Sequence, residues 1–91
     1  MNIIEKLSKQ KENKKMLKGW IDNAIMAKQE IKYYSEKRDY KNCREAEEFL
    51  VYCKDAIDMY IRSIAYLEGS VSGEKKMKDK LMKKVKKVLG E

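Results

Sequence analysis

Histidine is absent from the chain of 91 residues, and its absence removes the commonest forms of protein catalysis. A chain without histidine has no imidazole general base at neutral pH, no histidine-containing zinc site and no Ser-His-Asp triad. The two cysteines are too few to complete a tetrahedral zinc site. The sequence therefore predicts that the protein is not an enzyme and that it has no catalytic residue, no metal site and no cofactor.

Proline is absent as well, and three of the four glycines come after residue 68. Residues that interrupt helices are therefore scarce, while charged residues make up 41% of the chain. This combination is typical of long solvated helices rather than of sheets. The glycines also lack the spacing of a phosphate-binding loop. The fold class that the sequence predicts is all-α.

Long apolar runs are missing, since none approaches the roughly 20 residues that span a bilayer. The first six residues show neither the apolar core nor the small-residue cleavage site of a secretory signal. We expect a cytoplasmic protein without a membrane span. We interpret Cys43 and Cys53 as buried, reduced side chains, because about 15 Å of helix would separate them and prevent a bridge. A disulfide between two chains is the alternative.

What the chain does contain is positive charge, sorted by position. Residues 1–18 carry six Lys and two acids, and residues 74–91 carry eight Lys and three acids. The segment between them holds eight bases and ten acids, together with every Trp, Phe and Tyr. A slightly acidic middle is thus flanked by two cationic ends. Only three of the 22 bases are Arg, and such a Lys-rich composition is also typical of an AT-rich genome.

An apolar repeat that begins at Met16 predicts a first helix over residues 16–37. Its positions follow alternating steps of three and four residues, as in the seam of a coiled coil. The seam contains Leu17, Trp20, Ala24, Ala27, Ile31 and Tyr34. Residues 1–15 precede this repeat, and their polar run from Ser8 to Lys15 has no apolar face. We expect them to be a polar, basic N-terminal extension that forms a short or frayed helix.

A longer repeat predicts a second helix over residues 42–68. Its seam contains Cys43, Ala46, Leu50, Cys53, Ile57, Tyr60, Ile64 and Leu67. A neighbouring stripe on the same segment contains Phe49, Ala56, Met59 and Tyr66, with Tyr52 beside it. A helix that is apolar around so much of its circumference normally contacts two or more neighbours.

The two repeats are out of phase, and this mismatch predicts a turn between them. Continuing the first repeat beyond Tyr34 reaches only charged residues, and the segment from Tyr34 to Cys43 would span about two and a half helical turns. On one straight helix the two seams would lie on opposite sides, whereas in an antiparallel hairpin they face each other. Either Asp39 or Asn42 is placed to cap the second helix.

The segment of residues 69–73 is rich in Gly and Ser, which favour the end of one helix and the start of another. A third, basic amphipathic helix is predicted over residues 73–89. Its apolar side contains Met77, Leu81, Val85 and Val88. We expect residues 16–91 to form a single helical domain. The predicted architecture is an antiparallel helical hairpin plus this third helix, either as a three-helix bundle or as a dimeric four-helix core.

Three helices with the longest in the middle, together with an Asp39-Tyr40 turn, resemble the microtubule-interacting-and-transport domain. The turn and the helix after it also resemble the hairpins of tetratricopeptide repeats. Arg44, Glu47 and Glu48 stand where the small packed residues of these families are expected. The resemblance therefore extends to architecture alone and implies no binding residue.

The apolar and aromatic residues of the middle segment are the candidates for contact with another protein, because one short partner helix would not cover them all. The function that we favour is a small noncatalytic interaction module. It would act as an accessory or regulatory protein by docking on a protein partner or on itself as a homodimer. The predicted interface contains Trp20, Phe49, Tyr52, Met59 and Tyr66.

The alternative is a protein that binds nucleic acid nonspecifically through its Lys-rich ends. Base edges are read mainly by Arg, Asn and Gln, and the third predicted helix contains none of these. The candidate contacts are Lys75, Lys76, Lys80, Lys83, Lys84, Lys86 and Lys87. A nucleoprotein partner, targeted by a protein of a phage or other mobile element, would combine both hypotheses.

Overall fold

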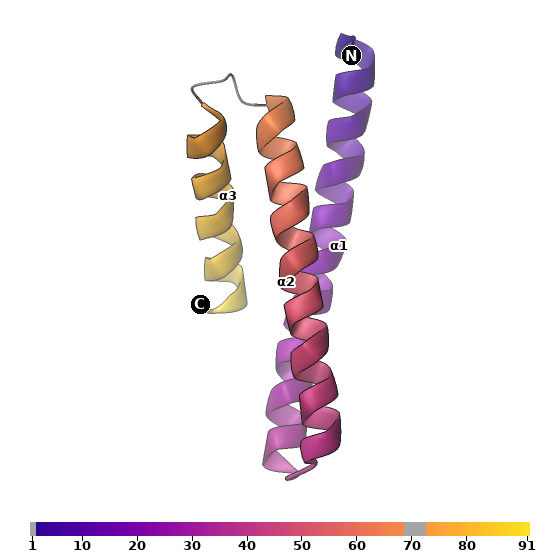
Figure 1. Cartoon of the computed structure of the whole chain (residues 1–91), viewed down its shortest axis with the longest axis vertical. Helices are drawn as coiled ribbons and strands as arrows, with labels where there is room; N and C mark the ends of the chain where they lie inside the picture. Colours follow the sequence, from indigo (N-terminus) through magenta and orange to yellow (C-terminus); the bar gives the residue numbers. More distant parts are fainter. Residues whose placement is uncertain (1, 69–72) are drawn as a thin grey trace.

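The fold consists of three α-helices in an elongated arrangement of 52 × 22 × 15 Å (Figure 1). The computed structural model describes residues 2–68 and 73–91. In chain order the helices are α1 (Ile3–Glu36), α2 (Tyr40–Glu68) and α3 (Glu74–Leu89). Neither of the two described ranges contains a β-strand. The predicted all-α class and the antiparallel hairpin with a third helix are therefore confirmed.

A tight turn centred on Arg38 reverses the chain between α1 and α2. Arg38 takes the left-handed conformation, with φ of 57°. Asp39 then caps α2, because its carboxylate accepts hydrogen bonds from the backbone amide and the side-chain amide of Asn42 at 3.3 and 2.7 Å. Of the two predicted caps, Asp39 is the one that is used. As a result α2 begins at Tyr40, slightly before its predicted start at residue 42.

The first helix begins much earlier than its predicted start at residue 16. α1 is continuous from Ile3, and the Asn2 side chain caps it by accepting a hydrogen bond from the Glu5 amide at 2.8 Å. Residues 3–15 therefore belong to the first helix and do not form a separate extension. With 34 residues, α1 is also longer than the 29 residues of α2, so the resemblance based on a longest middle helix is wrong in this respect.

Two amide side chains explain why the polar run between Ser8 and Lys15 is part of the packed hairpin. Gln10 and Asn13 are both buried, and the Gln10 side-chain amide donates a hydrogen bond to the carbonyl of Ile64 at 3.3 Å. A hydrogen bond of this kind compensates for moving a polar group out of water. The contact face of α1 therefore continues through residues that a search for apolar positions passes over.

The main core lies between α1 and α2, and α3 packs along one side of it. Small residues at the contact allow the first two helices to approach each other closely, since Ala24, Ala27 and Ala46 are almost completely buried. Larger buried side chains come from all three helices and are Leu17, Ile57, Ile61, Ile64, Leu67, Val85 and Leu89. Both predicted seams therefore contribute to this core.

The third helix runs antiparallel to α2 along the half of the hairpin that contains the start of α1 (Figure 1). Its Val85 and Leu89 are buried in the core, so its apolar side packs onto the hairpin. α3 ends at Leu89 and is capped by Gly90, whose φ of 76° is a left-handed conformation that glycine adopts without a Cβ clash. It begins at Glu74, one residue after its predicted start. The Gly and Ser signals predicted within residues 69–72 lie outside the described residues.

A matched pair of substitutions tests the assigned core. Ile61 is 0% exposed and Ile4 is 79% exposed. We expect Ile61→Val to lower the free energy of unfolding by about 0.5–1.5 kcal/mol, because it removes a fully packed methyl group. The same change at Ile4 should cost less than about 0.5 kcal/mol. Urea unfolding followed by circular dichroism measures both values, and equal losses would contradict this core.

Candidate interaction surface

One side of α2 carries large apolar side chains that remain exposed. Phe49, Tyr52, Met59 and Tyr66 have exposed fractions of 41, 62, 55 and 72%. They lie in one row along the helix, with smaller residues between them, at alternating steps of three and four residues. We call this row the outer stripe, and it contains Phe49, Tyr52, Ala56, Met59, Ser63 and Tyr66.

The outer stripe is exposed because α1 and α3 contact other sides of α2. Ile61 belongs to the core that all three helices share, and it lies about half a turn around the helix from Tyr52. We call the predicted seam of α2, from Cys43 to Leu67, the inner seam. Its members Ala46 and Cys53 are also buried. Two neighbours thus cover the inner seam, while the described part of the chain supplies no third neighbour for the outer stripe.

Trp20 connects the outer stripe to α1. Its ring meets the ring of Tyr52 edge to face, with centroids 5.3 Å apart and an angle of 63° between the planes. Trp20 is half-buried and also packs against the core, whereas Tyr52 is mostly exposed. An aromatic pair of this geometry contributes about 0.5–1.5 kcal/mol beyond its buried area. The contact therefore holds the exposed Tyr52 ring against the hairpin.

The five residues predicted as a protein interface occupy this region together. Four of them belong to the outer stripe, and Trp20 lies beside it through its contact with Tyr52. The structure adds Ser63, which fills a stripe position between Met59 and Tyr66. Because serine is polar, a pattern of apolar residues does not select Ser63. Its position seven residues after Ala56 is the sequence feature that places it in the stripe.

Charged residues flank the outer stripe unevenly. Glu45 and Glu48 are exposed near its Phe49 end. Asp55 is exposed near its middle, and Arg62 near the other end forms an ion pair with Asp58 through Nε and Oδ2 at 2.9 Å. The Phe49 end of the stripe therefore carries two acids with the exposed base Arg44 beside them, and the Tyr66 end carries the base Arg62.

A cleft of about 400 Å³ lies at the Tyr66 end of the outer stripe. It is lined by residues of α1 and α2, among them the bases Lys9 and Arg62, and by the acid Glu74 at the start of α3. Tyr66 and Leu67 form the apolar part of its wall. The cleft thus combines room for a side chain with a mainly basic rim.

The lysines predicted to contact nucleic acid are all exposed on α3. They are Lys75, Lys76, Lys80, Lys83, Lys84, Lys86 and Lys87. Figure 1 shows α3 and the first half of α1 in the same half of the molecule, away from the turn between α1 and α2. The two cationic ends of the sequence therefore lie in the same half of the fold.

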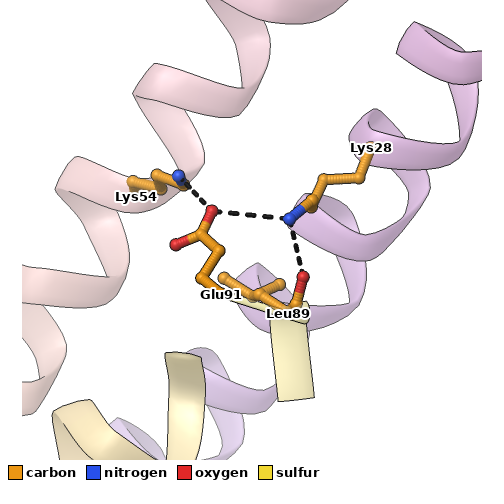
Figure 2. Close-up of polar contacts among 4 residues, drawn as sticks. All are labelled: Lys28, Lys54, Leu89 and Glu91. Carbon is orange, nitrogen blue, oxygen red and sulfur yellow. Dashed lines mark hydrogen bonds and ion pairs between the residues drawn. The ribbon is translucent and has the colours of Figure 1, made fainter. Parts of the chain in front are cut away.

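Two lysines of the hairpin bind the C-terminal end of α3 (Figure 2). We call the group of Lys28, Lys54, Glu91 and the Leu89 carbonyl the clasp. Lys28 of α1 donates a hydrogen bond to the Leu89 carbonyl at 2.6 Å, and its Nζ lies 3.5 Å from Oε1 of Glu91. Lys54 of α2 donates to the same Glu91 oxygen. The Lys54 hydrogen bond and the charges of both lysines hold the pKa of Glu91 below its ordinary value, although partial burial opposes this. The residues of the clasp are 37 and 63 positions apart in the chain, so no local spacing pattern in the sequence indicates it.

The cysteines show the features of structural rather than reactive thiols. Cys43 is half-buried, Cys53 is buried, and both are free thiols. Burial raises the pKa of both, and the neighbouring Glu47 carboxylate raises the pKa of Cys43 further. Each side chain is therefore a protonated thiol at neutral pH and a poor nucleophile.

Two further findings concern the described part of the chain only. Its His, Cys, Asp and Glu side chains form no group of three or more that could hold a metal ion. None of its helices combines the length and the apolar character that crossing a bilayer requires. The features considered for function are the outer stripe and the cationic surface, which is formed by the exposed lysines of α3 and of the first half of α1.

Comparison of the chain with protein-family models, with curated protein sequences and with solved structures gave no match. The residues of the outer stripe, the clasp and the cationic surface are therefore the basis for inferring function.

The clasp predicts a pH dependence of stability that Glu91→Gln removes. Because the folded pKa of Glu91 lies below its ordinary value of 4.5, the carboxylate stabilises the fold fully above that pH. Its contribution is lost as the pH falls through the lowered folded pKa. The melting temperature of the wild type should therefore exceed that of the variant near neutral pH, and this gap should close in acid. Glu12→Gln on α1 makes the same charge change and should show no such gap. A gap that is independent of pH would contradict the clasp.

Proposed function

We propose that the protein is a noncatalytic interaction module that docks on a protein partner through the outer stripe and Trp20. The observation that supports the proposal is a row of exposed aromatic and Met side chains on a helix whose inner seam packs against α1 and α3. Contiguous exposed apolar surface of this kind marks interaction sites on soluble proteins. A bound partner displaces water from the stripe and buries apolar surface that the hairpin leaves exposed. This burial stabilises the complex.

The residue types along the stripe suit recognition by a helix. Tyr, Trp, Phe and Met are enriched in the centres of protein interfaces, where they carry much of the binding energy. Phe49, Tyr52 and Met59 project from one side of a rigid helix, so little conformational entropy is lost when a partner binds. Their steps of three and four residues match the way in which two helices interlock.

A binding role is also consistent with the chemistry of the chain. The sequence has no His, and both thiols are held protonated. The carboxylate of Glu91 is occupied by two lysines in the clasp. We therefore infer an accessory or regulatory protein that acts by occupying its partner.

A second candidate function is nonspecific binding of nucleic acid. It is favoured by the position of α3 and the start of α1 in the same half of the molecule, where their lysines add to one positive field (Figure 1). A cluster of Lys side chains binds phosphates as point charges and carries no base specificity. The lysines of α3 are not part of the outer stripe, so the two functions are tested with different variants.

The docking function predicts that polar substitutions in the outer stripe abolish partner binding. Phe49→Ser with Met59→Ser should weaken binding at least about tenfold, because two apolar anchors are lost. Ile3→Ser with Ile4→Ser removes exposed apolar residues outside the stripe and should leave binding unchanged. Affinity capture from the native host with mass spectrometry identifies the bound protein, and titration of that protein measures each variant. Equal binding by the wild type and the stripe variant would contradict the proposal.

The second candidate predicts binding that depends steeply on salt. Four exposed lysines of α3 are replaced by glutamine in the test variant, namely Lys83, Lys84, Lys86 and Lys87. The slope of log affinity against log salt should decrease by up to about 3–4, since each phosphate contact adds about 0.9. Fluorescence anisotropy with duplex and single-stranded DNA and RNA measures the slope. Replacing Lys32, Lys37 and Lys41 near the turn is the control. Wild-type protein that fails to bind even at low salt would remove this candidate.

A further inference from the structure

We propose that the occupant of the outer stripe is a second copy of this chain, whose α2 packs antiparallel against α2 of the first copy. The two α1–α2 hairpins then form a four-helix core around a two-fold axis that passes between the levels of Ile57 and Asp58. This inference rests on the proposed function, because it assigns a partner to the same surface. Its evidence comes from the spacing, the side-chain sizes and the charges along α2.

The outer stripe has the spacing and the length of a coiled-coil seam. Its six positions between Phe49 and Tyr66 follow steps of three, four, three, four and three residues. They extend over about 25 Å of helix, which is enough for several layers of interlocking side chains. The stripe also lies about a quarter turn from the seam that contacts α1. That is the angle between two neighbours of one helix in a four-helix bundle.

The sizes of the stripe residues favour the antiparallel direction. With Phe49 at the level of Tyr66 of the second copy, Tyr52 faces Ser63 and Met59 faces Ala56 across the inner layers. Each large side chain of an inner layer then meets a small one, which is how packed layers fill space without voids. In the parallel direction the large residues would meet their own copies, as would Ala56 and Ser63. Only the antiparallel direction interlocks.

Charge at the edge of the stripe favours the same register. Asp55 and Arg62 lie one heptad apart along one edge of the stripe. In the antiparallel register Asp55 of one copy lies about 3 Å along the helix axis from Arg62 of the other. The two-fold axis produces this ion pair twice. The Arg62 side chain is 64% exposed beside Asp58 and has donors free for a second carboxylate.

The two ends of the stripe are complementary as well. The Phe49 end, with the acids Glu45 and Glu48 and the base Arg44, is placed beside the cleft of about 400 Å³ at the Tyr66 end of the second copy. Lys9 and Arg62 form the basic part of that cleft, and Phe49 of the other copy lies at its level. A parallel dimer would instead place Glu45 and Glu48 of one copy at the level of the same acids of the other.

The antiparallel direction also limits repulsion between two chains of net charge +7 each. Most of this charge lies on α3 and on the first half of α1, in one half of the molecule. Antiparallel pairing about the middle of α2 places these halves at opposite ends of the dimer. α3 also packs on the inner side of α2 and not on the outer stripe. The lysines of the two copies are therefore kept apart.

A charge-exchange series with size-exclusion chromatography and light scattering tests the dimer and its direction. Wild-type protein should have twice the monomer mass of 10.8 kDa and dissociate on dilution. Asp55→Arg alone and Arg62→Asp alone should each weaken the dimer at least about tenfold, because like charges then face each other. The double variant should restore the affinity. Asp22→Arg, on the exposed side of α1, is the control and should not change it. Circular dichroism confirms that each variant is helical.

Each outcome distinguishes this inference from the proposed function. A wild type that stays monomeric at every concentration overturns the dimer. If the Phe49 and Met59 variant still loses a captured protein in that case, the docking function stands with another partner. A dimer in which the double variant fails to restore affinity overturns the antiparallel register. A monomer whose stripe variant also binds captured proteins normally overturns both proposals.

Discussion

The packing of α1 against α2 is the contact on which the rest of the structure depends. Asp39 caps the start of α2, and three buried alanines allow the two helices to lie close together. This contact uses one side of α2, and α3 uses the adjacent side through residues such as Ile57 and Val85. What remains of the apolar circumference of α2 is the outer stripe. The exposed surface is therefore a consequence of how the core is formed.

The periodic part of this arrangement could be predicted from the sequence. The two seams, the turn between them and the apolar side of α3 follow from spacing alone, because helix geometry converts steps of three and four residues into a face. The same reasoning selected Trp20 and the aromatic residues of α2 as one surface. Excess apolar circumference is a local property of a helix, so a single sequence is sufficient to reveal it.

Contacts between distant polar groups could not be predicted in this way. Gln10 reaches the Ile64 carbonyl, and Glu91 reaches lysines on two helices, across large separations in the chain. No spacing rule reports such pairs, because they depend on where packed helices happen to align. For this reason the apolar repeat predicts a start of α1 at residue 16 rather than at Ile3, and no sequence pattern indicates the clasp. The same limit applies to the ion pair that we propose between Asp55 of one copy and Arg62 of the other. It can be proposed only after the outer stripe and its register have been defined.

The central claim is that the chain reverses at Arg38, so that the start of α1 lies beside the end of α2. Spin labels at Glu12 and Tyr66, in a variant with Cys43→Ser and Cys53→Ala, test it most directly. Unlabelled chain added in excess keeps the measured distance within one molecule. Pulsed electron resonance should give a separation of about 20 Å, since packed helices lie about 8–10 Å apart. A separation of about 80 Å, as in one unbroken helix, would contradict the account.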